Sequence, residues 1–198
     1  MRCLKQLRLA MAGHMQLQQG FTLQIAKDII NLRDGLEYVQ LSGCSRFVSV
    51  TNVLSILDTP IPCLKTLDLH SIKYPARRYD IQLPLNKISD SPWGCIGLQV
   101  LRITISERGE ERPDIASRQR LCRQIGLLTH LQELSIRDEF KKRGGFAPIL
   151  GQGLEFMDGL KKLEILRISP DAQASYAETK WIKSHWPSLR VISGLRLP

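Results

Sequence analysis

Residues 131–136 read Leu-Gln-Glu-Leu-Ser-Ile, and this order of aliphatic residues at the first, fourth and sixth positions decides the fold. The pattern returns along the 198-residue chain at steps of 32, 28, 34, 33 and 32 residues. Because Leu, Ile and Val are common, one match means little, and it is the even spacing that identifies an internal repeat. The units begin at Leu4, Leu36, Leu64, Leu98, Leu131 and Leu163, with a weaker seventh at Leu189. Overlapping matches at Val100 and Leu160 leave the register of the fourth and sixth units open.

Each match predicts a short β-strand whose alternate side chains point inward. Between the strands, apolar residues follow helical spacing, as in Leu121, Cys122, Ile125 and Leu128. Similar helical segments are expected over 21–32, 53–57, 149–160 and 176–186. Strands that recur with a helix between them form a parallel sheet, and this strand signature predicts a leucine-rich-repeat solenoid. The expectation is an α/β domain over 1–198 with six to seven irregular repeats, a curved sheet on the concave face, helices on the convex face, and 176–198 as the C-terminal capping unit.

The position between the last two aliphatic residues is polar in every unit, which predicts that one face of the sheet is open to solvent. A doubly wound sheet covers both faces and needs nearly continuous apolar strands. Arg and Tyr on rigid strands are favoured at protein interfaces, and the alternative is a solvated face without a ligand. The candidate partner-binding residues on this face are Arg8, Tyr38, Gln40, Asp68, His70, Arg102, Arg137 and Arg167.

Three long connectors interrupt the regular units, over 72–95, 106–120 and 137–145. Solenoids commonly carry variable surface loops at such places. The first connector is aromatic and basic, and this composition also fits a partner contact. Its residues of interest are Tyr74, Arg77, Arg78, Tyr79 and Trp93.

The composition excludes several classes of protein. With 43% apolar and 24% charged residues, the chain is neither disordered nor membrane-spanning. Five scattered cysteines form neither a disulfide framework nor a zinc site, which favours an intracellular, cytoplasmic or nuclear protein. The formal charge of +9 leaves a basic nucleic-acid-associated protein as the alternative function, although no nucleic-acid-binding motif is present.

Catalytic motifs are missing from the sequence. The four histidines, at positions 14, 70, 130 and 185, have no metal-ligand spacing, and neither a nucleophile elbow nor a phosphate-binding loop occurs. The sequence therefore predicts no enzyme, with no catalytic residue, cofactor or metal, and indicates a protein-binding scaffold.

The C-terminal run over 181–194, Trp-Ile-Lys-Ser-His-Trp-Pro-Ser-Leu-Arg-Val-Ile-Ser-Gly, resembles the closing unit of fungal F-box and leucine-rich-repeat-like proteins. The segment over 63–69, Cys-Leu-Lys-Thr-Leu-Asp-Leu, resembles their repeats. The resemblance implies the substrate-recognition repeats of a ubiquitin-ligase adaptor, whose F-box docks onto the ligase. This chain departs from that pattern, because it begins inside a repeat and shows no F-box.

The N-terminal residues 1–27 are basic and free of acids, as in a mitochondrial presequence, but the register of Leu4, Leu7 and Leu9 favours a folded first repeat. An upstream domain or cap is expected to cover these three residues, and the isolated chain is expected to be poorly soluble without it.

Overall fold

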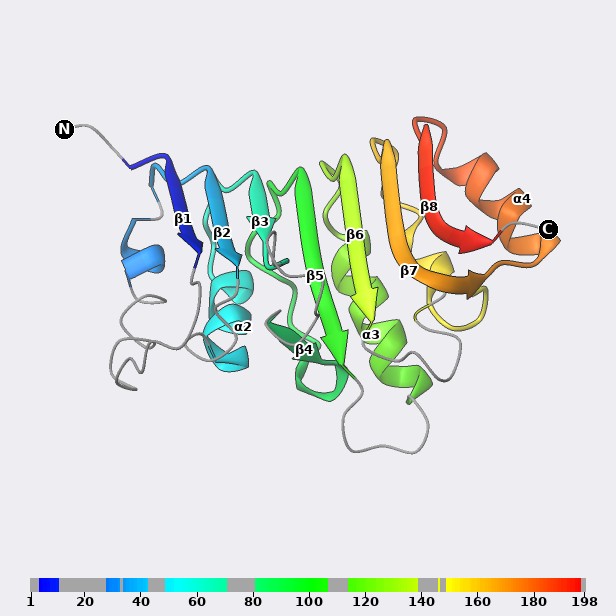
Figure 1. Ribbon diagram of the computed structural model, residues 1–198, viewed down its shortest axis with the longest axis horizontal. Coiled ribbons are helices and arrows are strands. Elements are labelled where there is room, and N and C mark those ends of the chain that lie inside the picture. The colour runs from blue at the N-terminus through cyan, green and yellow to red at the C-terminus, as the bar shows by residue number, and fades with distance from the viewer. Residues whose placement is uncertain are drawn as a thin grey trace.

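The computed structural model of the protein describes residues 4–10, 28–32, 34–42, 49–70, 81–106, 114–138, 146 and 149–196. It is an α/β protein with one open, all-parallel sheet (Figure 1). The sheet order is β1-β2-β3-β5-β6-β7-β8, and β4 pairs with β5 beside this path. The described strands are β1 (Gln6–Ala10), β2 (Tyr38–Ser42), β3 (Thr66–Asp68), β4 (Gln82–Pro84), β5 (Val100–Ser106), β6 (Glu133–Asp138), β7 (Ile165–Gln173) and β8 (Val191–Arg196).

In the described part of the chain, three α-helices with described bounds and two short 3-10 helices connect these strands, in addition to the helical residues 28–31. They are α2 (Val50–Asp58), η2 (Leu85–Lys87), α3 (Ile115–Gly126), η3 (Leu154–Met157) and α4 (Tyr176–His185). In Figure 1, α2 and α3 lie behind the strands and α4 lies next to β8. Each α-helix begins where a polar side chain accepts a backbone N–H of the first turn: Ser49 caps α2, Asp114 caps α3, and Ser175 caps α4 in a capping box with Glu178.

The strand register confirms the repeat units. Leu101 of β5 pairs with Leu134 of β6, which pairs with Leu166 of β7, which pairs with Ile192 of β8. This pairing settles the two units that the sequence left open, since they begin at Leu98 and Leu163 rather than at Val100 and Leu160.

The turn that enters each strand is also repeated. In five units the backbone N–H of the first Leu donates to the carbonyl three residues before it, as from Leu131 to Leu128 over 2.9 Å; these residues are Leu64, Leu98, Leu131, Leu163 and Leu189. The carbonyl that follows this Leu accepts two N–H groups of the next unit, so that Gln99 accepts from Gln132 and Glu133. The same paired acceptance occurs at Lys5, Glu37, Lys65, Gln99, Gln132 and Glu164. Six successive junctions thus share one backbone geometry.

The aliphatic positions of the units form one hydrophobic core. Leu36, Leu67, Leu101 and Leu134 are completely buried, and each such side chain contributes about 1.5–3 kcal/mol of burial free energy. The first unit is less well covered, because Leu4 is 45% exposed and Leu7 and Leu9 are only partly buried. The poor solubility that we expect of the isolated chain stays a prediction.

The prediction of a helix over 149–160 is wrong. Gly151 and Gly153 have φ values of +77° and +131°, which a right-handed helix cannot accommodate, and only η3 forms between them and the next strand. Of the helix expected over 21–32, the described part is helical at 28–31, and 21–27 lie outside the described residues. The remaining expected helices are confirmed as α2, α3 and α4.

The first connector contains a strand that the repeat pattern did not predict. β5 has seven residues, of which β3 pairs with the first three, and β4 pairs in parallel with its last three. The signal was present, because Ile81, Leu83 and Leu85 alternate with other residues and all three are buried. Trp93 is also buried, in the hydrophobic core, and its part in a partner contact stays a prediction. The other four residues named for this contact lie outside the described residues.

Candidate functional site

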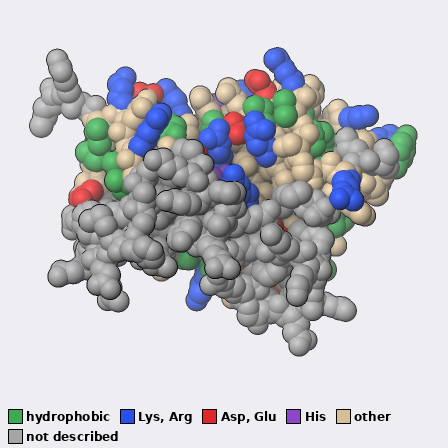
Figure 2. Space-filling view, viewed as in Figure 1, with side chains coloured by type: hydrophobic (Ala, Val, Ile, Leu, Met, Phe, Trp, Pro, Cys, Tyr) green, Lys and Arg blue, Asp and Glu red, His purple; other side chains and the backbone are tan. Residues whose placement is uncertain are grey.

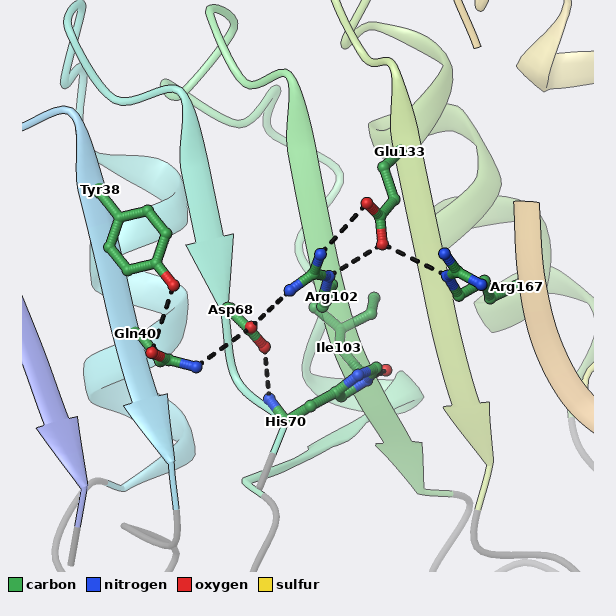
Figure 3. Close-up of polar contacts among 8 residues, drawn as sticks. All are labelled: Tyr38, Gln40, Asp68, His70, Arg102, Ile103, Glu133 and Arg167. Atoms are coloured by element: carbon green, nitrogen blue, oxygen red, sulfur yellow. Dashed lines mark hydrogen bonds and ion pairs between the residues drawn. The ribbon is translucent and has the colours of Figure 1, made fainter. Parts of the chain in front are cut away.

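Seven side chains on one face of the sheet form a continuous row of polar contacts, which we call the polar ladder, and Figure 3 draws all of them except Arg8. They come from six neighbouring strands of the sheet order. Strand register explains the row, because Gln40, Asp68 and Arg102 pair directly across β2, β3 and β5, and side chains in register stand about 4.8 Å apart. The members of the polar ladder are Arg8, Tyr38, Gln40, Asp68, Arg102, Glu133 and Arg167.

The first half of the polar ladder crosses β1, β2 and β3. The guanidinium carbon of Arg8 lies 4.8 Å from the ring centroid of Tyr38, a cation–π distance. The Tyr38 hydroxyl donates to Gln40 Oε1 over 3.2 Å. The Gln40 amide then donates to Asp68 Oδ2 over 3.3 Å.

Arg102 is the centre of the second half. Its Nη1 donates to Asp68 Oδ2 over 2.9 Å, while its Nε and Nη2 donate to the two carboxylate oxygens of Glu133 over 2.9 and 3.1 Å. Glu133 also accepts from Arg167 Nε over 3.5 Å. A bidentate Arg–carboxylate pair is stronger and more directional than a single ion pair, so this half of the row is fixed in geometry.

The charges of the polar ladder support one another. Burial raises the pKa of Glu133, but the hydrogen bonds and charges of Arg102 and Arg167 outweigh it and hold that pKa below its ordinary value. The hydrogen bond to Glu133 raises the pKa of Arg102 against the effect of burial. Glu133 and Arg102 are therefore both charged at neutral pH.

A pH titration tests this charge network. Glu133 has a lower pKa in the folded chain than when unfolded, so its stabilising effect is present above about pH 4.5 and is lost as the pH falls through the folded pKa. We expect Glu133→Gln to lower the free energy of unfolding by about 1–2 kcal/mol at neutral pH. Urea unfolding should show this difference shrinking on acidification. If the free energies of unfolding of the unmodified chain and of Glu133→Gln differ by the same amount from neutral to acidic pH, the charge network is contradicted.

His70 lies beside the polar ladder at the point where β3 ends. Its backbone N–H donates to Asp68 Oδ1 over 3.0 Å, and its ring Nε2 lies 2.9 Å from the carbonyl oxygen of Ile103. The imidazole thus bonds to β5 in the gap between β3 and β4, and it is buried. This placement gives His70 a structural role, and a partner contact at His70 stays a prediction.

The polar residues between the last two aliphatic positions of the units form a row across the sheet, which we call the central row: Arg8, Gln40, Asp68, Arg102, Ser135 and Arg167. The prediction that the whole central row is exposed is wrong. Gln40, Asp68 and Ser135 are only 6%, 2% and 5% exposed, although all three point to the polar face. The physical reason is side-chain length. Ser135 stands in register between Arg102 and Arg167, and both of these longer side chains reach across to Glu133.

The predicted site residues therefore divide into groups. Arg8 and Arg167 are exposed, and Tyr38 and Arg102 are half-buried. Arg137 is half-buried further along β6, in register with Thr104. Glu133 was not among the candidates, yet it joins Arg102 to Arg167. Its signal was its place two residues before the central row, since side chains two apart on a strand share a face.

The two buried cysteines that the structure describes, Cys95 and Cys122, are not activated nucleophiles. Burial raises the pKa of Cys95 and of Cys122 to about 12 each, and the Cys95 thiol donates to the carbonyl of Ile56 over 3.0 Å. Both thiols remain protonated at neutral pH and act as packing residues.

Among the described residues, no His, Cys, Asp or Glu group has an arrangement that could hold a metal ion. Within the same part of the chain, every helix is too short or too polar to cross a bilayer. No protein-family model matches the chain, and neither a curated protein nor a solved structure was found to match it.

Proposed function

We propose that the protein is a non-enzymatic leucine-rich-repeat solenoid that binds a protein partner on the face carrying the polar ladder. The repeated turn and the repeated backbone acceptance at six junctions support stacked, equivalent units. A stack of this kind presents its strand side chains in rows on one surface. The observation that carries the binding role is the polar ladder itself, which runs unbroken over six strands and ends in exposed arginines.

The face has the composition of a binding surface. It combines arginines with a tyrosine, the residue types enriched in interface hot spots. Arg102 and Glu133 hold each other on rigid strands, so a partner would meet side chains that are already ordered. Preordered groups lose less conformational entropy on binding than flexible ones.

The resemblance of the C-terminal run to F-box and repeat proteins extends this proposal. The chain would be the substrate-recognition portion of a ubiquitin-ligase adaptor, and Trp186 would close the last apolar layer. Trp186 is buried, and its indole N–H donates to the carbonyl of Met157 over 3.0 Å. An F-box in the coding sequence upstream of Met1 would support the adaptor role, and a stop codon there would contradict it.

Affinity purification tests the binding face. We expect Arg8→Glu/Arg167→Glu to lose at least one class of protein that the unmodified chain captures from a cell extract, because reversed charges at an interface cost several kcal/mol. The matched control is Lys180→Glu/Lys183→Glu on α4, which makes the same charge change on exposed residues away from the sheet face. Quantitative mass spectrometry compares the captured proteins. Identical partner lists for the chain and both variants would contradict the proposed binding face.

A further inference from the structure

The two ends of the polar ladder carry arginines whose donors are incompletely used. Among the described residues no ion pair involves Arg8, which is exposed and has its guanidinium over the ring of Tyr38. The Arg167 side chain is 47% exposed, and its described contact is the single long one from Nε to Glu133. A guanidinium presents five N–H donors in a planar fork. The arginine at each end of the polar ladder can therefore donate hydrogen bonds to a carboxylate of another molecule.

The centre of the polar ladder has the opposite character. Arg102 is enclosed by Asp68 and Glu133, and these two carboxylates outnumber its single charge. The whole row has three arginines and two acids, or 3 − 2 = +1. In Figure 2, Lys and Arg side chains gather over the visible upper part of this face, with acidic side chains between them. An added negative charge is favoured at the ends and disfavoured in the middle.

The spacing of the two ends sets a length. Arg8 lies on β1 and Arg167 on β7, which are five steps apart in the sheet order. Neighbouring strands are about 4.8 Å apart, so the two strands are about 24 Å apart. An extended peptide advances about 3.4 Å per residue. Seven residues therefore cover the distance from one arginine to the other.

We propose that the polar ladder recognises an extended peptide with acidic residues at both ends of a stretch of about seven residues and uncharged polar residues between them. The peptide crosses the strands, places its acids on Arg8 and Arg167, and leaves its middle against Gln40 and Arg102. This inference rests on the proposed function and names the partner chemistry of the same face. A nucleic-acid strand fits less well, because its evenly spaced phosphates would oppose the Asp68 and Glu133 carboxylates.

Two fluorescein-labelled peptides of equal composition test the inference. In DESGTGSDE the acidic pairs are seven residues apart, whereas in SGTDEDEGS they are adjacent. We expect fluorescence anisotropy to give about tenfold tighter binding of the separated peptide, because only it reaches both arginines while avoiding the central acids. Arg8→Glu/Arg167→Glu should weaken that binding at least tenfold. Lys180→Glu/Lys183→Glu should change it by less than about twofold.

Several outcomes would overturn the inference. They are equal affinity for the two peptides, no binding of either at about 1 mM, or tighter binding of a single-stranded RNA of about 12 nucleotides. Circular dichroism and thermal unfolding establish that each variant folds. If the reversal at Arg8 and Arg167 abolishes protein capture but the two peptides bind equally, this inference fails and the proposed binding face stands. If capture is unaffected by that reversal, the proposed function fails independently of the peptides.

Discussion

Replacing Arg102 with Leu lowers the free energy of unfolding by about 2–4 kcal/mol. The substitution removes the cation that, among the described residues, pairs with both Asp68 and Glu133, whose side chains are only 3% and 12% exposed. Breaking a buried ion pair commonly costs 3–5 kcal/mol, since a charge is left without a partner. The value expected here is smaller, because Arg102 itself is 35% exposed and water screens part of the interaction. Urea unfolding at neutral pH measures the change.

A rescue variant and a control variant show whether the loss of stability comes from the unpaired carboxylates. Arg102→Leu combined with Asp68→Asn and Glu133→Gln should recover most of the lost stability, because the two carboxylates are then neutral. Arg190→Leu, which changes an exposed arginine before β8, should shift stability by less than about 0.5 kcal/mol. Equal effects of Arg102→Leu and Arg190→Leu would show that the charges of the polar ladder do not contribute to the fold.

Replacing Gly126 with Ala destabilises the protein by about 3 kcal/mol or more. A Cβ at this position would lie 1.9 Å from the carbonyl oxygen of Phe156, and the obstacle is backbone that cannot rotate away. Alanine improves helix propensity by about 1 kcal/mol, but the clash is larger, because forced overpacking costs 1–3 kcal/mol even where side chains are able to adjust. Thermal unfolding followed by circular dichroism measures the loss.

Gly126 matters because it lies where α3 packs against η3. It is the last residue of α3, and Phe156 belongs to η3 of the following unit. A Cβ at Gly159 would in turn lie 2.7 Å from the carbonyl oxygen of Gly126. Gly151→Ala is the control, since a Cβ there meets nothing within 4 Å and only the positive φ penalises it, by about 1–2 kcal/mol. If Gly126→Ala is as stable as the unmodified chain, this packing of α3 on η3 is contradicted.

The strands and their register could be predicted from the sequence because the determining signal is local. An aliphatic pattern of six residues, repeated at even spacing, is enough to place Leu101, Leu134 and Leu166 side by side. The helix over 149–160 failed for an equally local reason, because apolar spacing was weighed above three glycines. Two of these glycines take positive φ values. β4 was missed because its alternating residues lie outside the repeat pattern. It pairs only with the last three residues of β5, which extend beyond the part of β5 that pairs with β3.

The site was less predictable than the strands. Sequence reasoning placed Gln40, Asp68 and Arg102 on one face, but it treated them as separate exposed positions. Their burial depends on side chains from neighbouring strands, which no single unit encodes. Glu133 was overlooked because its importance comes from two arginines, 31 and 34 residues away.

Site-specific photocrosslinking tests the central claim, that the face carrying the polar ladder is the binding surface. A photoreactive amino acid replaces Gln6 or Ile165, which lie two residues before Arg8 and Arg167 on the same face, in one pair of proteins, and Lys180 or Lys183 in a second pair. The account predicts that both face positions crosslink the same partner protein and that neither α4 position does. Crosslinks from the α4 positions alone, with none from either face position, would contradict it.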